Sequence, residues 1–221
     1  MLSRRSLLAA AVPASLPPAD RLALRLPGAV VLRAEWEGGV DTSIQPGSLW
    51  KPFLAASHVG PPPRYYCDGS HCWLGRKHGW LDLPGALANS CNQWFQQLYP
   101  TLVFPLALFP QWGLPVPPDD NWPEWPCTPR ALANAYAELL ARRADYPLVW
   151  AGLRLAAERG TARALGRGFL AKTGTGPSRR HAGDGWVAAA YPTDTPATFW
   201  LYRQRGVTGA QAAAALRREL P

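Results

Sequence analysis

The feature that most constrains this chain is a proline directly after a Ser-x-x-Lys pattern, in the stretch Pro46-Gly47-Ser48-Leu49-Trp50-Lys51-Pro52-Phe53. Proline fits only the first turn of a helix, so Pro52 predicts a helix that begins near Ser48 and continues to about Ser57. In that turn Ser48 and Lys51 share one side, so the amine can reach the hydroxyl. A serine becomes a nucleophile when a neighbouring amine of lowered pKa takes its proton. The stretch therefore predicts an activated serine near a helix N-terminus, where developing negative charge is stabilised.

Lysine is rare in this sequence, which makes each lysine informative. The chain has only three, Lys51, Lys77 and Lys172, and its other basic residues are arginines. Because only the amine of lysine loses its proton near neutral pH, a retained lysine indicates a position where arginine cannot substitute. Lys172 begins a Lys-Thr-Gly motif in a strand-like run, which offers an ammonium, a hydroxyl and a bare backbone edge to a ligand. A phosphate loop has another order, with the lysine after the glycines and before a helix.

A third motif, Ser90-Cys91-Asn92, lies between the other two and supplies a hydroxyl and an amide. The motifs Ser-x-x-Lys, Ser-x-Asn and Lys-Thr-Gly, in this order, resemble those of the serine penicillin-recognising family, which contains penicillin-binding transpeptidases, D,D-carboxypeptidases and serine β-lactamases. Residues 25–220 most resemble the transpeptidase domain of the high-molecular-weight penicillin-binding proteins. Besides the three motifs, the resemblance rests on Cys72-Trp73, His78-Gly79, Leu81-Asp82-Leu83, Phe95, Thr128-Pro129, Ala135-Tyr136, Gly160-Thr161-Ala162 and Asp184-Gly185-Trp186.

The resemblance implies a fold, a reaction and a substrate class. The fold would be α/β of the α+β kind, with an antiparallel sheet of about five strands flanked by helices and a helical subdomain. The penicillin-binding transpeptidases and carboxypeptidases act on D-Ala-D-Ala peptides of peptidoglycan through a serine acyl-enzyme, and they bind penicillin. It implies no cofactor and no metal. We therefore expect a D,D-transpeptidase or D,D-carboxypeptidase whose partners are the peptidoglycan stem peptide and β-lactams.

The resemblance also assigns the catalytic roles. Ser48 would be the nucleophile and Lys51 its base. Ser90 would relay a proton to the leaving amine. Lys172 would hold the electrostatics of the site.

Substrate binding falls to the remaining motif residues. Asn92 would hydrogen-bond the substrate amide. Thr173 and Thr175, on either side of Gly174, would receive the substrate carboxylate. The backbone N–H groups of Ser48 and Thr175 would form the oxyanion hole.

Two departures from the family leave other functions open. The intervals from Ser48 to Ser90 and from Ser90 to Lys172 are short for the family, and we expect no glycosyltransferase region, no N-terminal pedestal and no membrane anchor. These features favour a trimmed enzyme over one that cross-links polymer. One alternative is a serine β-lactamase or esterase, although Glu124 and Glu138, the nearest acidic residues by position, stand in no recognisable motif. The other is a penicillin-sensing or binding domain without turnover.

The four cysteines permit several interpretations. Cys67, His71, Cys72 and His78 are ligand types for zinc, but their spacing fits no common zinc pattern. We therefore expect a loop closed by a Cys67–Cys72 disulfide, with free thiols as the next alternative and a metal as the least favoured. Cys91 and Cys127 also allow a pairing, and Cys91 allows a thiol nucleophile, although nothing around it indicates activation.

The length and charge of the chain limit its organisation and partners. Residues 1–19 hold a paired arginine and a short Ala/Leu run, which predict a twin-arginine-like export signal with a short linker; a disordered start is the alternative. Residues 20–221 then form a single transpeptidase-like domain, exported to the periplasm or beyond and soluble after cleavage. The formal charge of +8 comes from scattered residues, so we expect no nucleic-acid partner.

Several further elements follow from local signals. Ala29–Leu32 predicts a buried strand, with a turn at residues 37–39. The many prolines and tryptophans between residues 99 and 126 predict an irregular loop that either walls the substrate cleft or is pinned to the core. Thr128 and Thr208 predict helix N-caps, and a helix should run from about Pro147 to Glu158. Strands are expected at residues 168–174, 185–191 and 197–203.

Overall fold

A computed structural model describes residues 18–73, 75, 77–102, 109–115, 121–176 and 183–220. Nearly all of the predicted export signal lies outside this part of the chain, and it stays a prediction. Within the described residues, no helix is both long enough and apolar enough to cross a bilayer.

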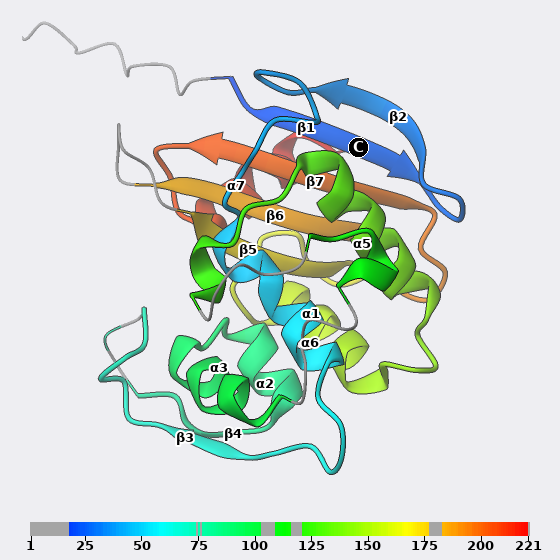
Figure 1. Cartoon of the computed structure of the whole chain (residues 1–221). Coiled ribbons are helices and arrows are strands. Elements are labelled where there is room, and N and C mark those ends of the chain that lie inside the picture. The colour runs from blue at the N-terminus through cyan, green and yellow to red at the C-terminus, as the bar shows by residue number, and fades with distance from the viewer. Residues whose placement is uncertain are drawn as a thin grey trace, which may run out of the picture.

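A five-stranded sheet forms the frame of the molecule (Figure 1). The strand order is β2-β1-β7-β6-β5, and every neighbouring pair is antiparallel. This confirms the predicted antiparallel sheet with flanking helices. The strands are β1 (Asp20–Arg25), β2 (Val30–Glu35), β5 (Leu170–Gly176), β6 (Asp184–Tyr191) and β7 (Thr198–Arg205).

Helices cover both faces of this sheet. Helix α7 (Gly209–Glu219) packs on one face, and α5 (Pro129–Ala141) lies across the other (Figure 1). Successive side chains of a strand point to opposite faces, so β6 serves two cores. Val187 and Ala189 join the core under α7, whereas Trp186 and Ala188 join the core on the other side. Both faces of the sheet are therefore buried at its middle, which leaves the edges as the places where polar residues can form a site.

A helical subdomain adjoins the β5 edge of the sheet (Figure 1). It also carries a short hairpin, β3 paired with β4, on its outer side. The subdomain places the Ser48 turn and the Ser90 turn opposite β5. Its elements are η1 (Gly47–Trp50), α1 (Lys51–Ala56), β3 (Tyr65–Cys67), β4 (Gly79–Leu81), α2 (Leu83–Ala88), α3 (Asn92–Leu98) and α6 (Pro147–Glu158).

Local capping signals predicted the helices well. The Thr128 Oγ1 accepts a hydrogen bond from the Ala131 N–H, and Thr208 forms a capping box with Gln211 at the start of α7. Helix α6 has the predicted bounds, and β5, β6 and β7 fall within two residues of the predicted strands. The helix predicted from Ser48 to Ser57 is present, with a 3-10 first turn.

The prediction of a buried strand at Ala29–Leu32 is right about the strand and wrong about its burial. The strand β2 begins at Val30, but it is the sheet edge, and Val30, Val31 and Leu32 are 46%, 46% and 53% exposed. The buried strand of this hairpin is β1, where Leu22 and Leu24 are almost fully covered. An apolar run indicates a strand but not its position in the sheet, because position depends on which strands pair with it.

The segment rich in proline and tryptophan contains only short 3-10 turns in its described parts: η2 (Tyr99–Thr101), η3 (Pro110–Trp112) and η4 (Trp122–Glu124). Trp112, Trp122 and Trp125 are buried, and Trp125 packs edge-on against Phe109. The tryptophans thus pin the segment to the core. Trp122 also lies 5.4 Å from the Lys51 amine, so this part of the segment walls the site as well.

Candidate active site

The predicted nucleophile lies in a firmly held turn. Ser48 is half-buried in η1, and Lys51 is the first residue of α1, with Pro52 in the first turn as predicted. The hydroxyl of Tyr136 donates to the Leu49 carbonyl at 2.8 Å, and the indole of Trp50 donates to the Trp125 carbonyl at 3.1 Å. These two bonds hold the two residues that directly follow Ser48.

The Lys51 amine is fully buried and joins the first motif to the second. Its Nζ donates to the Ser90 carbonyl at 2.6 Å, to Asn92 Oδ1 at 2.6 Å and to Ser90 Oγ at 3.3 Å. Asn92 therefore presents its oxygen to Lys51, which leaves the amide nitrogen as its other polar end. The link runs from Lys51 to Ser90 and Asn92, whereas the sequence predicted a contact with Ser48.

The Lys172 amine reaches the same serine from the sheet side. Its Nζ donates to Ser90 Oγ at 2.7 Å and to the Thr173 carbonyl at 2.5 Å. Ser90 Oγ thus lies between two buried lysines, one from each side of the site. Ser90 holds this position in a left-handed backbone conformation, with φ of 51°, which is uncommon for a residue with a side chain. All three motifs therefore meet at one hydroxyl.

Burial changes the proton affinity of both lysines. It lowers the pKa of Lys51 to about 7, although the nearby Cys91 and Cys72 act in the opposite direction. The pKa of Lys172 is lowered well below its usual range, first by burial and then by repulsion from Lys51. An apolar setting disfavours the charged amine, and the rings of Phe95 and Trp122 lie against Lys51. Lys51 is therefore suited to accept a proton near neutral pH.

Strand β5 approaches the Ser48 turn unusually closely. A Cβ added to Gly174 would lie 2.4 Å from the Pro46 carbonyl, and one added to Gly47 would lie 2.5 Å from the Thr175 carbonyl. Gly47 also has φ of 57°, which favours glycine. These glycines allow the backbone of β5 to lie beside η1, whereas the Lys-Thr-Gly motif had predicted a close approach by a ligand.

A pocket of about 250 Å³ lies where the three motifs meet. Its lining includes six predicted site residues: Ser48, Ser90, Asn92, Thr173, Gly174 and Thr175. Lys51 and Lys172 lie fully buried behind this lining. A larger hollow of about 720 Å³ elsewhere is lined by residues such as Leu26 and Trp150 and contains no motif residue, so the smaller pocket is the candidate active site.

The pocket also contains residues that the sequence did not single out for the site. Thr161 Oγ1 accepts a hydrogen bond from Thr173 Oγ1 at 2.6 Å, and the Gly209 N–H donates to Thr175 Oγ1 at 3.2 Å. Trp73 lines the same pocket. Thr161 and Trp73 stood within the resemblance but without a role. Gly209 carried no signal, because its place depends on how α7 packs against β5.

The predicted Cys67–Cys72 disulfide is wrong, and no other pair of the four cysteines forms one. Cys67, Cys72 and Cys91 instead surround His78, and His71 is exposed. Burial raises the pKa of Cys91 to about 12 in this structure, so the alternative of a thiolate nucleophile there has no support. The sequence could not show this group because Cys91 belongs to a different element from the other two cysteines.

Comparison with solved structures finds transpeptidase domains. The D,D-transpeptidase domain of a peptidoglycan glycosyltransferase from Eggerthella lenta matches with a TM-score of 0.75 and 12% identity, over 90% of this chain and 76% of that chain. PBP2 from Pseudomonas aeruginosa, in complex with WCK 5153, matches with a TM-score of 0.72 and 18% identity, over 90% and 69%. The TP domain of penicillin-binding protein 3 from Burkholderia pseudomallei gives 0.72 and 13%, over 92% and 88%.

No family model matches the sequence, and no curated protein sequence matches it significantly. The likeness is therefore one of structure, at sequence identities that show the fold alone. The chain has the fold of the D,D-transpeptidase domains of penicillin-binding proteins.

Proposed function

We propose that the protein is a serine acyltransferase that acts on D-Ala-D-Ala peptides of peptidoglycan and that penicillin acylates at Ser48. The observation that supports this most strongly is the meeting of Ser48, Ser90 and two buried lysines at one pocket. Peptidoglycan lies outside the cytoplasmic membrane, so the proposal includes export by the signal predicted at residues 1–19.

In the first step, Ser48 Oγ attacks the carbonyl carbon of the penultimate D-Ala. The hydroxyl proton passes to the Lys51 amine, which is neutral because burial lowers its pKa to about 7. Negative charge develops on the carbonyl oxygen, and the backbone N–H groups of Ser48 and Thr175 stabilise it. Each such donor contributes about 3 kcal/mol to the barrier reduction.

In the second step, the C–N bond breaks and the terminal D-Ala leaves. Its nitrogen takes a proton through Ser90 Oγ, which the Lys51 and Lys172 amines both contact. The substrate carboxylate binds at Thr173 and Thr175, and its charge raises the pKa of Lys172 again, because an opposite charge favours the ammonium. An ester of Ser48 remains, and water or an amine then takes the acyl group.

The pocket favours this function over that of a β-lactamase. None of the described residues that line it carries a carboxylate. Glu124 is exposed in η4, and Glu138 lines the larger hollow instead. The described lining therefore offers no carboxylate to activate a deacylating water, which disfavours a β-lactamase that relies on such a base.

Labelling with a fluorescent penicillin tests the proposal. We expect the wild-type protein to be labelled, Ser48→Ala to take no label, and Ser57→Ala to be labelled at the wild-type rate. Ser57 is a matched control because it ends the same helix and its hydroxyl donates only to the Phe53 carbonyl. Absence of label on the folded wild-type protein would overturn the proposal.

Two further readouts separate the remaining functions. Release of D-Ala from a pentapeptide would support the peptidase, and labelling without such release would favour a penicillin-sensing domain. Shedding of the label within seconds would favour the β-lactamase.

A further inference from the structure

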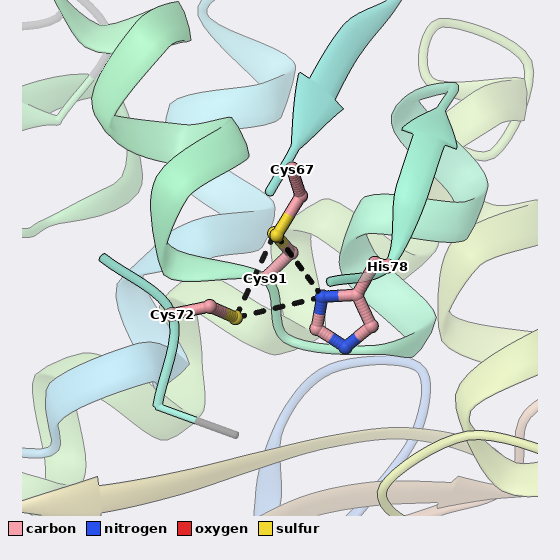
Figure 2. A group of neighbouring side chains, drawn as sticks. All are labelled: Cys67, Cys72, His78 and Cys91. Atoms are coloured by element: carbon pink, nitrogen blue, oxygen red, sulfur yellow. Dashed lines mark hydrogen bonds between the residues drawn. The ribbon is translucent and has the colours of Figure 1, made fainter. Parts of the chain in front are cut away.

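Three thiols and one imidazole converge in the helical subdomain (Figure 2). Cys67 ends β3, Cys72 lies in the following loop, His78 directly precedes β4, and Cys91 is the N-cap of α3. The three sulfur atoms and His78 Nδ1 all lie within 4.8 Å of one another. Cys67 and Cys91 are fully buried, and Cys72 is 9% exposed. The three sulfur atoms are therefore shielded from solvent, His78 is half-buried, and the group joins the stretch from Cys67 to His78 with the start of α3.

The distances fit a tetrahedral metal ion. The Nδ1 of His78 lies 3.4 Å from the Cys67 sulfur and 3.5 Å from the Cys72 sulfur, and the Cys72 and Cys91 sulfurs are 3.9 Å apart. Zinc with bonds of about 2.3 Å to sulfur and about 2.0 Å to nitrogen, at tetrahedral angles, separates sulfur from nitrogen by about 3.5 Å and sulfur from sulfur by about 3.8 Å. A disulfide would require about 2.05 Å between sulfurs.

The chemistry of the ligands selects the metal. Thiolate and imidazole together favour zinc, and a set of three cysteines and one histidine, with no open position, is typical of a closed, structural zinc site. The small separations leave room for one ion only, which argues against an iron–sulfur cluster. We propose that Cys67, Cys72, His78 and Cys91 bind one structural zinc ion, and that this ion holds the Ser90 turn of the active site in place.

The position of Cys91 explains how a zinc ion would hold the Ser90 turn in place. Cys91 lies between Ser90 and Asn92 in the chain, and both of these neighbours accept a hydrogen bond from the Lys51 amine. The opposite end of the cluster is a hairpin of only three residue pairs, Tyr65–Cys67 with Gly79–Leu81, and such a hairpin is marginal without further support. A metal that joins the hairpin to Cys91 restrains both, much as a short cross-link would.

Metal content tests the site directly. We expect the full chain, purified under reducing conditions with zinc present, to retain about one zinc ion per molecule through gel filtration. Cys67→Ser and Cys72→Ser should lose it, whereas Cys127→Ser should keep it. Cys127 is the matched control because it is buried but stands outside the cluster. His78→Gln should lose the zinc, and His71→Gln should keep it.

Cobalt substitution keeps the test decisive if the cysteine variants do not fold. The wild-type protein with Co²⁺ should show thiolate-to-metal charge-transfer bands and the visible absorption of a tetrahedral ion. Absence of bound zinc and of these bands in the folded wild-type protein would overturn the site, as would a Cys67–Cys72 disulfide located by peptide mapping without reduction.

The link to the Ser90 turn rests on the proposed acyl transfer and has its own readout. Removal of zinc by a chelator should slow penicillin labelling by about tenfold or more, because small displacements of catalytic groups are costly. Re-addition of zinc should restore it. If the zinc-loaded protein is labelled and zinc removal leaves the rate unchanged, the link is wrong while the acyl transfer stands. If the zinc-loaded protein is not labelled at all, the acyl transfer itself fails.

Discussion

At the scale of single residues, the proposed activity depends on the protonation states of two lysines. Lys51 and Lys172 are both fully buried and both donate to Ser90 Oγ. Two ammonium groups so close together repel one another, and burial disfavours each of them. The unliganded site therefore holds fewer than two positive charges near neutral pH. This is the state in which Lys51 can act as a base.

This arrangement predicts the pH dependence of acylation. The pKa of Lys51 is lowered to about 7, so the amine is protonated below that pH and neutral above it. Only the neutral amine can accept the Ser48 proton. The rate of penicillin labelling should therefore rise with pH through a midpoint near 7 and then level off. Stopped-flow labelling between about pH 5.5 and about pH 9 measures this.

Lys51→Arg sharpens the same prediction. Guanidinium stays protonated throughout this range, so the variant should lose labelling at every pH. A wild-type profile that is flat, or that rises only near the ordinary pKa of lysine, would show that Lys51 is not the base. Lys77→Arg is the matched control, because Lys77 lies outside the pocket.

The sequence predicted which residues form the site but not all of their contacts. Ser48, Lys51, Ser90 and Lys172 belong to short motifs whose chemistry can be read locally. The bonds from Lys51 to Ser90 and Asn92 depend instead on how α1 packs against α2 and the turn that follows α2. The sequence named Cys67, Cys72 and His78 as ligand types but grouped them with His71, because Cys91 is supplied by another element.

At the scale of elements, the pocket exists because β5 lies directly against η1. Gly47 and Gly174 permit this approach, since a side chain at either position would collide with the backbone of the other element. The same approach places Thr175 beside Ser48, where the proposed oxyanion hole requires both N–H groups. The glycines therefore matter to catalysis as well as to packing.

Gly47→Ala should damage both stability and acylation. The added methyl would lie 2.5 Å from the Thr175 carbonyl, so η1 and β5 must separate. We expect a loss of about 2 kcal/mol or more in the free energy of unfolding, together with a large fall in the labelling rate of the folded fraction. Urea denaturation and labelling kinetics measure the two effects.

Gly206→Ala is the control for backbone strain. Gly206 has φ of 71°, but its added methyl would meet no atom within 4 Å. It should cost about 1 kcal/mol and leave labelling of the folded protein unchanged. Equal effects of the two substitutions on labelling would contradict the proposed role of close packing.

Element boundaries were predictable where a side chain marks them. Thr128, Thr208 and Pro147 start helices by capping or by their fixed backbone angle, so their signals lie within one turn. The burial of β2 was not predictable in this way. Its apolar residues would suit a central strand, and only the pairing of β1 with β7 places β2 at the edge.

At the scale of the whole molecule, the two ends of the described chain are fastened together. The strand β1 lies between β2 and β7, and Arg21 forms an ion pair with Glu219 of α7. Asp20 is nearly buried, contacts Arg203 and Arg205 of β7, and accepts a hydrogen bond from the Glu37 N–H at 2.7 Å. The sheet therefore includes residues from both ends of the described chain.

Asp20→Asn should weaken this closure. It removes the charge that compensates two partly buried arginines, and loss of one partner from a buried pair costs about 3 kcal/mol. We expect unfolding to remain a single transition with a lower urea midpoint. Asp41→Asn is the control, because the Asp41–Arg130 pair is exposed and should change stability little. Equal effects would show that the Asp20 cluster does not anchor the sheet.

The central claim is that Ser48 becomes covalently acylated, and intact-mass spectrometry after incubation with benzylpenicillin tests it most directly. The account predicts a gain equal to the full mass of one penicillin, because the β-lactam ring opens onto the serine without loss of atoms. Peptide mapping should locate the adduct on the peptide that contains Ser48. An unchanged mass of the folded protein, or an adduct on any other residue, would contradict the account.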